Sequence, residues 1–174
     1  MNIEEIFKDL YEFPCWNVQW DAVINLEMSF GQPFLNIDDP NPNSRHFTHK
    51  RVVTIKGEWL LWVASGYWEL SGYDFDKVRY STSYKRKQRA LYKLDGQKII
   101  KTTINPITAA TQWEFDLGGI LSVRRKKMNT QDYLWSLYYP NGHAFSVRAD
   151  GKYHYDLMDK TIDEIVWKTF DSSK

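Results

Sequence analysis

Residues 18–30 read VQWDAVINLEMSF and alternate between apolar and polar side chains. Every even position is apolar, and only Val23 interrupts the polar odd positions. Successive side chains of a β-strand point to opposite faces, so this period of two predicts one strand, or two strands joined by a bend. We expect the even face of this stretch to lie on a hydrophobic core.

The sequence after this stretch predicts a loop and then more strands. Residues 31–46, GQPFLNIDDPNPNSRH, contain three of the six prolines and predict a long loop. Residues 51–72 read RVVTIKGEWLLWVASGYWELSG, which Lys56-Gly57 and Ser65-Gly66 divide into three expected strands. The middle strand, residues 59–64, is apolar on both faces, so we expect it at the centre of a sheet that is covered on both sides.

The last third of the chain is rich in hairpin signals. Gly118-Gly119, Asn141-Gly142 and Asp150-Gly151 suit the positive φ angles of tight hairpin turns. The strands expected around them, which form an antiparallel meander, are 97–104, 110–117, 120–126, 132–139, 143–149 and 152–156. The sequence therefore predicts one all-β domain over residues 1–174, built as an antiparallel sandwich or half-open barrel.

Three segments have helical spacing. Apolar residues recur between Ile3 and Tyr11, with Asn2 as the expected N-cap and Pro14 as the stop. Residues 83–94, SYKRKQRALYKL, predict a short helix between two groups of strands. Its expected docking face consists of Tyr84, Ala90, Leu91 and Leu94, and its charged face of Lys85, Arg89 and Lys93. Residues 161–170 predict a last short helix.

Composition limits the class of protein. The 174 residues carry a formal net charge of +1, so any attraction to nucleic acid or a membrane has to be local. The single cysteine, Cys15, excludes an intramolecular disulfide and fits a reducing compartment. Residues 1–5 lack the basic, then apolar, pattern of a secretion signal, and no apolar run approaches the ~20 residues of a membrane span. We expect a cytoplasmic protein with no membrane contact.

No arrangement of residues indicates catalysis. His46 and His49 are three residues apart, but further metal ligands are missing nearby. Cys15 has no identifiable base, and a buried structural thiol is the favoured interpretation. His143 and His154 are expected to be ordinary strand residues, and Asp38-Asp39 precedes Pro40 in a turn signal. P-loop, GxSxG and HExxH motifs are absent. The sequence therefore predicts neither an enzyme nor a cofactor.

Basic residues gather in two places. Residues 77–93 hold seven basic side chains and no acidic one, and Arg124 to Lys127 are four basic residues in a row. A solvated helix face explains the first cluster as well as any function does. If both clusters share one side, the patch can bind nucleic acid phosphates or an acidic protein surface. The sequence leaves these alternatives open.

Two passages resemble a known family. They are residues 49–70, HKRVVTIKGEWLLWVASGYWEL, and residues 94–125, with LYYPNGHAFSVRADGKYHYD following at 137–156. The order of a basic strand, a VTIKGEW segment, LDGQK and an FDLGG hairpin is similar to small bacterial proteins associated with immunity in polymorphic toxin systems, including contact-dependent growth inhibition. The resemblance implies a toxin-binding protein without catalytic residues, and one class of target that it suggests is a nuclease domain.

The expected function is therefore neutralisation of a cognate toxin domain by direct contact. The expected contact residues lie in the loop at 31–46, in the basic helix and at the end of the strand at 120–126. They are Phe34, Asp38, Asp39, Lys85, Arg86, Arg89, Arg124, Arg125 and Lys126. Nuclease inhibitors are often acidic, whereas this chain is nearly neutral. Its partner should therefore offer an acidic surface, or the contact should use the acidic segment 36–39 or the N-terminal helix. The alternatives are a nucleic-acid-binding module and a β-barrel that encloses a small ligand.

Overall fold

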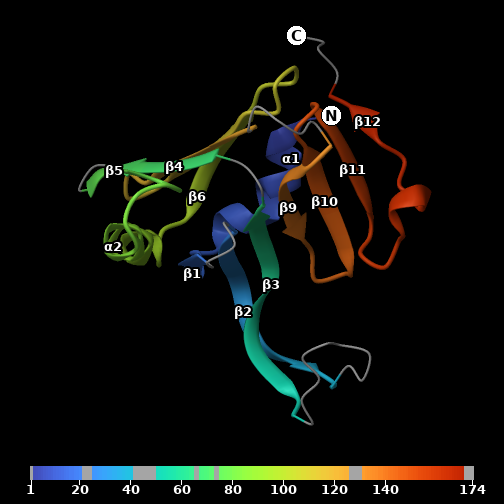
Figure 1. The fold of residues 1–174 in the computed structure, drawn as a ribbon, viewed down its shortest axis with the longest axis horizontal. Coiled ribbons are helices and arrows are strands. Elements are labelled where there is room, and N and C mark those ends of the chain that lie inside the picture. The colour runs from blue at the N-terminus through green and yellow to red at the C-terminus, as the bar shows by residue number, and fades with distance from the viewer. Residues whose placement is uncertain are drawn as a thin grey trace.

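Two antiparallel sheets dominate the structure, a computed structural model that describes residues 2–20, 25–40, 50–64, 67–72, 75–125 and 131–170. Neither sheet closes on itself, so the fold is an open all-β sandwich, as the sequence predicts. Figure 1 shows the sheets side by side, with α2 at one end and parts of β2 and β3 projecting away from the rest.

The larger sheet has seven strands in the order β1-β2-β3-β9-β10-β11-β12. Their bounds are β1 Trp16–Trp20, β2 Leu26–Asp38, β3 Val52–Val63, β9 Tyr133–Tyr138, β10 His143–Arg148, β11 Lys152–Leu157 and β12 Lys168–Thr169. The smaller sheet has the order β5-β4-β8-β7-β6. Its strands are β4 Tyr67–Gly72, β5 Phe75–Arg79, β6 Ile99–Ile104, β7 Thr111–Phe115 and β8 Ile120–Arg124. The predicted meander is thus split between the sheets after β8.

Aromatic side chains join the two sheets at the core. The rings of Trp113 in β7 and Trp135 in β9 meet edge to face, with centroids 5.5 Å apart. The Trp135 indole N–H also donates to the Thr111 hydroxyl at 2.8 Å, so this polar group is satisfied inside the core. Phe7 lies against both tryptophans. All three aromatic side chains are buried, as expected of the centre of a sandwich.

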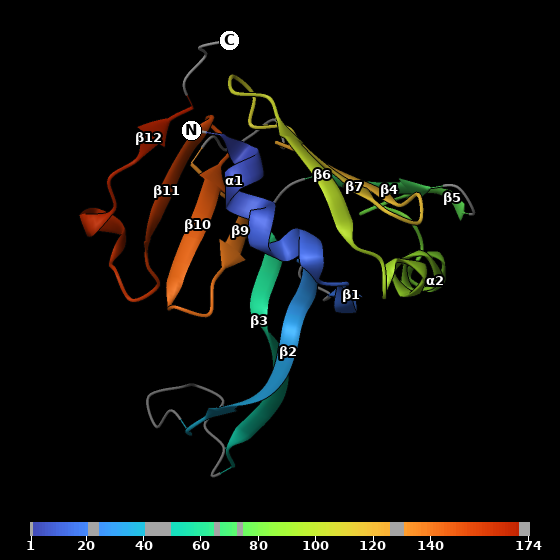
Figure 2. The ribbon, with the colours of Figure 1, turned by 180° about the vertical axis from the view of Figure 1, so that it is seen from behind.

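The N-terminal helix closes one side of the sandwich. It comprises the α-helix α1, Ile3–Phe7, and the 3-10 helix η1, Lys8–Glu12, and Figure 2 shows it lying between the sheets. Asn2 is the N-cap, as predicted, because its side chain accepts from the Glu4 N–H at 3.1 Å. Glu4 accepts from the Thr102 backbone in β6, and the Tyr139 hydroxyl donates to the Ile6 carbonyl. The helix is therefore hydrogen-bonded to both sheets.

The second helix, α2, spans Tyr84–Leu94 and contacts β1 and β5. Ala90, Leu91 and Leu94 are buried as predicted. The Tyr84 ring lies against Trp20 of β1, with centroids 6.1 Å apart, but it is 62% exposed and so lies at the rim of the docking face. Lys87 also takes a buried place. Its ammonium lies 3.2 Å from the centroid of the Trp20 ring and donates to the Tyr80 carbonyl at 2.8 Å. Ser83, the N-cap residue of this helix, makes no side-chain hydrogen bond to it.

Cys15 lies where α2 meets β1. Its thiol donates to the Leu94 carbonyl at 3.1 Å, and its own carbonyl accepts from the Gly96 N–H. Burial raises the pKa of this thiol to about 12, so it stays protonated. The side chain therefore fits the structural role that the sequence favoured.

The strand predictions for the first half of the chain are confirmed in one place and need two corrections. The period-two stretch forms two antiparallel strands, β1 and β2, which is the second of the two expected arrangements, and residues 21–24 lie outside the described residues. Residues 31–38, predicted as loop, continue β2, while 41–46 lie outside the described residues. Gly57 does not divide its segment, because β3 runs unbroken from Val52 to Val63. Residues 65–66, the second expected break, also lie outside the described residues, between strands of different sheets.

The C-terminal strands confirm the turn signals and correct the last helix. Gly118, Gly142 and Gly151 adopt φ angles of 91°, 79° and 83° at the predicted hairpin turns. Residues 161–170 form only a 3-10 turn, Ile162–Glu164, and the short strand β12. Val166 is exposed there, whereas Phe170 is buried against Tyr153. The segment thus adds an edge strand to the sheet where a helix was expected.

Candidate partner-binding site

Part of the β2–β3 pair extends beyond the sheet as a two-stranded ribbon of residues 31–38 and 52–57. β1 pairs with β2 only up to Ser29, and β9 pairs with β3 only from Leu60. In the described part of the chain, both outer edges of the ribbon are therefore unpaired. The projection is plain in Figures 1 and 2. Unpaired strand edges are able to add a strand from another chain.

The two faces of the ribbon differ in chemistry. Directly opposed residues of an antiparallel pair share a face. Leu35 opposes Ile55 and Ile37 opposes Val53, so one face is wholly aliphatic. The other face carries the pairs Phe34–Lys56, Asn36–Thr54 and Asp38–Val52. The ribbon is therefore amphipathic, like a strand pair at the surface of a core.

The aliphatic face is exposed. Leu35, Ile37, Val53 and Ile55 have between 56% and 63% of their surface accessible. They continue the face of β3 that carries Trp59, Leu61 and Val63, of which Leu61 and Val63 are fully buried. The core-facing pattern of the strand thus runs past the end of the core. Contiguous exposed apolar surface of this kind marks interaction sites in soluble proteins.

Two glycines shape the junction between the ribbon and the sheet. A bulge between Phe30 and Pro33 adds one residue to β2, so the core-side positions change from even to odd numbers there. Gly31 within the bulge has a φ of 73°. A Cβ atom on Gly57 would lie 2.4 Å from the Phe30 carbonyl oxygen, so only glycine allows this close approach. Pro33 is tolerated because it lies beside the bulge on an edge strand.

A groove of about 610 Å³ lies at the base of the ribbon, on its mixed face. Phe34, Asn36 and Lys56 of the ribbon line one part of it. The remaining walls include Leu60 and Trp62 of β3, Tyr138 of β9, and Met158 after β11. The volume and the aromatic lining are typical of a site that receives a ligand or a segment of another protein.

Charged residues lie where the described part of the ribbon ends. Asp39 is exposed and accepts from the Arg51 guanidinium at 2.7 Å. Asp38 is exposed and accepts from the Asn36 amide at 3.0 Å. The structure therefore places the predicted contact residues Phe34 and Asp38 on the ribbon and Asp39 directly after it.

The basic helix forms a separate exposed surface. Lys85, Arg86 and Arg89 are exposed on α2, whose apolar side chains face the core. Lys87, four residues before Leu91, faces inward beside Trp20 and does not belong to this surface. The predicted charged face of the helix, Lys85, Arg89 and Lys93, is thus exposed as expected, and Lys87 is the basic residue that lies in the core.

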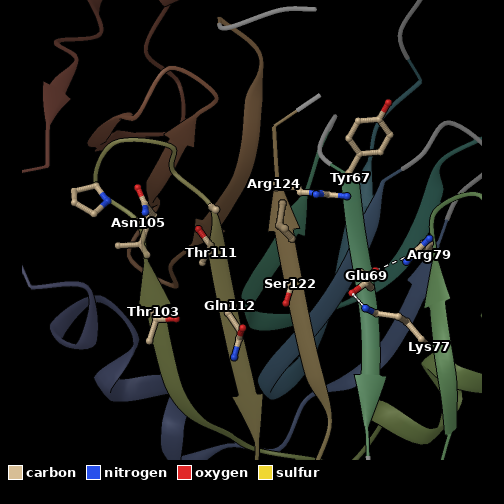
Figure 3. A pocket seen from close by; sticks show the side chains of 14 residues that line it. Tyr67, Glu69, Lys77, Arg79, Thr103, Asn105, Thr111, Gln112, Ser122 and Arg124 are labelled. Carbon is tan, nitrogen blue, oxygen red and sulfur yellow. Dashed lines mark hydrogen bonds and ion pairs between the residues drawn. The ribbon is translucent and has the colours of Figure 1, made fainter. Parts of the chain in front are cut away.

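The strand-end arginines lie in another part of the molecule. Arg124 lines a polar groove of about 710 Å³ over the smaller sheet, together with Lys77 and Arg79 (Figure 3). Lys77 and Arg79 both form ion pairs with Glu69, at 2.7 and 2.8 Å. These two cations hold the pKa of Glu69 below its usual value, and the hydrogen bond from Lys77 has the largest effect. Arg125 is exposed just after β8, and Lys126 lies outside the described residues. Arg124 thus lines the same groove as Lys77 and Arg79, but only these two bind Glu69 among the ion pairs of the described residues.

Sequence reasoning missed the aliphatic face of the ribbon. Its signal was present, because Leu35 and Ile37 alternate with polar residues, as do Val53 and Ile55. The prolines at 33, 40 and 42 outweighed it. His46 and His49 lie outside the described residues, and in the part of the chain that is described no three His, Cys, Asp or Glu residues are grouped to hold a metal.

Comparison with known proteins places the chain in no group. No family model, curated protein or solved structure matches it. Neither helix of the described residues has the length and apolarity that a bilayer crossing requires.

Proposed function

We propose that this protein binds a cognate toxin domain and neutralises it by direct contact, as an immunity protein does. The observation that carries the proposal is the aliphatic face of the ribbon, formed by Leu35, Ile37, Val53 and Ile55, which are all more than half exposed. A two-stranded ribbon is marginally stable alone, and a partner that covers this face adds the packing that it lacks.

The surroundings of the ribbon fit a protein partner. Interfaces commonly combine an apolar centre with aromatic anchors and a charged rim. Here Trp62 and Tyr138 line the adjoining groove, and Asp39 and Arg51 are exposed near the described end of the ribbon. The family resemblance of the sequence points to a toxin as this partner. The mode of action is occupation of the toxin, so no catalytic group is required.

The nucleic-acid alternative receives less support. Lys77 and Arg79 are both engaged with Glu69, which lowers the charge that the polar groove offers to a phosphate. The exposed cations of α2 are left as the main electrostatic feature. They suit an acidic surface on the toxin, which would accelerate association.

Growth rescue tests the proposal. The C-terminal domain of a large secreted protein encoded beside this chain's gene should arrest growth when expressed in the cytoplasm of a laboratory bacterium. Co-expression of the wild-type protein should restore growth, and the two proteins should copurify. A gene neighbourhood without such a protein, or a toxin that the wild-type protein fails to neutralise, would contradict the immunity role.

A matched pair of variants tests the ribbon. Leu35→Thr with Ile55→Thr makes the aliphatic face more polar and uses β-branched residues, which suit strands. The control, Thr54→Asn, changes an exposed residue on the opposite face that is not among the residues lining the groove. The first double variant should lose rescue and copurification, and the control should keep both. Rescue by both variants would move the contact away from the aliphatic face.

A further inference from the structure

The two edges of the ribbon differ in what they offer to another chain. On the β2 side, a bulge at Gly31 interrupts the edge, and the Trp16 indole N–H donates to the Gly31 carbonyl at 3.1 Å. Bulges of this kind protect a strand edge from further pairing. On the β3 side the strand is regular, because the register places the extra residue on β2 alone. The β3 edge is therefore the one that is suited to pair with another strand.

The directions of the backbone groups along β3 follow from one hydrogen bond. Directly after β3, the Ala64 N–H donates to the Leu134 carbonyl, on the β9 side, at 2.9 Å. Backbone groups of successive residues in a strand point to alternate sides, so the even-numbered residues of β3 face the β9 side. β9 pairs only with the sheet end of β3. In the ribbon, Val52, Thr54 and Lys56 therefore direct their backbone groups outward, and no described residue hydrogen-bonds to them there.

The side chains beside this edge define the strand that it would receive. On the aliphatic face, Val53 and Ile55 are more than half exposed, so the residues beside them in an added strand should be apolar. On the mixed face, Lys56 forms no ion pair with any described residue. A carboxylate opposite Lys56 would complete a cross-strand pair of opposite charge. The edge thus fits an extended segment that alternates apolar with polar residues and is acidic at one position.

The groove at the base of the ribbon leaves room for such a strand where it meets the sheet. Lys56 and Gly57 of the β3 edge line the groove, as do Tyr138, the last residue of β9, and Pro140 in the turn that follows. A strand added to the ribbon would therefore continue the line of β9, which is antiparallel to β3. Its side chains on the mixed face would enter the groove beside Tyr138.

We propose that the β3 edge of the ribbon, residues 52–57, pairs with an extended segment of the toxin domain, antiparallel to β3 and in line with β9. Apolar residues of the segment widen the aliphatic face, and a carboxylate lies beside Lys56. This inference rests on the proposed function, because it specifies how the ribbon holds the toxin. Backbone hydrogen bonds along the edge fix the register of the partner, which apolar contact alone does not.

Amide hydrogen exchange of the full chain, followed by NMR, tests the edge without the toxin. The probe is a capped heptapeptide that alternates threonine with valine and carries one glutamate, and the control peptide has lysine in place of the glutamate. At millimolar concentrations the probe should slow exchange of the Thr54 and Lys56 amides at least about tenfold, and the control peptide should act more weakly. The amide of Asn36, directly opposite Thr54 and on the other edge, should not change. No slowing at the β3 edge, or equal slowing at Asn36, would overturn the proposal. Slowing that grows with protein concentration alone would assign the edge to a second copy of this chain instead.

Two variants at one position separate the backbone of the edge from its side chain. Thr54→Pro removes an outward N–H, which an edge strand tolerates, whereas Thr54→Asn changes only the side chain. The first should weaken binding of the peptide at least about tenfold and abolish growth rescue, and the second should do neither. Slow exchange of the Val53 and Ile55 amides, which face β2, checks that the ribbon persists. Full rescue by Thr54→Pro would refute strand addition and leave the proposed function standing. A wild-type protein that fails to neutralise the toxin would refute that function, while the peptide experiment still decides whether the edge pairs.

Discussion

The two halves of the β2–β3 pair have the same sequence pattern in opposite surroundings. In one half, Met28 opposes Leu61, and both side chains are fully buried in the sandwich. In the other half, Leu35 opposes Ile55 on the same face, and both are more than half exposed. Alternation therefore reports that a strand face is to be covered, but it does not tell whether the same chain or another one covers it.

The largest expected effect on stability distinguishes the buried half of the β2–β3 pair from its exposed half. Leu61→Ala leaves a cavity in a closed core and should lower the free energy of unfolding by about 2–5 kcal/mol. Ile55→Ala on the ribbon should change it by about 0.5 kcal/mol or less, because the side chain is already largely in water. Urea unfolding at low protein concentration measures both. A loss at Ile55 similar to that at Leu61 would mean that the ribbon face is covered in the free protein.

The junction between the halves should be the next most sensitive place. Gly57→Ala places a Cβ atom against the backbone of Phe30, so we expect a loss of roughly 1–3 kcal/mol. Thr54→Ala, three residues along the same strand, should cost much less because Thr54 is exposed. Urea unfolding gives the stabilities, and hydrogen exchange of the ribbon amides reports its attachment. Equal effects at both positions would show that the close approach at Gly57 carries no strain.

The sequence predicted the hairpins better than it predicted the ribbon. Asn141-Gly142 and Asp150-Gly151 specify turns through local φ angles, so the strands from 97 to 156 were placed to within a few residues. The ribbon depends on a bulge that moves the core-side positions of β2 from even to odd residue numbers, and on pairing with β3, which begins at Val52. The prolines of this segment predicted a loop instead. Long-range pairing and local conformation are different kinds of information, and only the second is visible in a short window.

The contact residues divide in the same way. Phe34, Asp38 and Asp39 were chosen for a loop, but Phe34 and Asp38 lie on β2 and Asp39 directly follows it. The basic clusters were expected to merge if they shared a side. Instead Arg124 lies near Lys77 and Arg79 over the smaller sheet, whereas Lys85, Arg86 and Arg89 are on α2. Which residues of a charged run stay exposed depends on tertiary packing, as Lys87 illustrates.

Helix α2 repeats the contrast between covered and uncovered positions within a single turn. Lys87→Met removes the ammonium that lies over Trp20 and donates to the Tyr80 carbonyl, and we expect a loss of roughly 1–3 kcal/mol. Lys85→Met, two residues away and exposed, should stay within about 0.5 kcal/mol of the wild type. Thermal and urea unfolding of the two variants compare them. A neutral effect at Lys87 would show that the methionine replaces its packing fully.

The free energy of unfolding should depend on pH through His154, on the outer face of the larger sheet. Because burial lowers the pKa of His154, the unfolded chain takes up this proton at a higher pH than the native protein does. Stability should therefore be level above about pH 6.5 and should fall as the pH drops below it. Asp156 opposes the lowering and Lys160 adds to it.

Urea midpoints between about pH 5 and 7 isolate this histidine from the carboxylates, which titrate at lower pH. His154→Phe should flatten the decline, and His143→Phe should leave it unchanged. A wild-type protein whose stability is the same at both ends of this range would contradict a neutral, buried His154.

The smallest expected effect on stability belongs to the basic face of α2, where a functional effect is expected instead. Changing Lys85, Arg86 and Arg89 together to Glu should alter the free energy of unfolding by no more than about 0.5 kcal/mol, since exposed charges contribute little. The wild-type spacing of Lys85, Arg89 and Lys93 places like charges one turn apart, a small cost that an acidic partner relieves. The triple variant should therefore associate more slowly with an acidic toxin surface and lose most of the salt dependence of that step, as stopped-flow mixing can measure.

Nucleic acid binding predicts a different result: the wild type would bind mixed RNA in the micromolar range at near-physiological salt, with an affinity that falls steeply as salt rises. We expect no such binding, because Lys87 of α2 is turned inward and Lys77 and Arg79 are engaged with Glu69. Tight RNA binding that the triple variant abolishes would assign this face to nucleic acid and leave the ribbon alone as the protein contact.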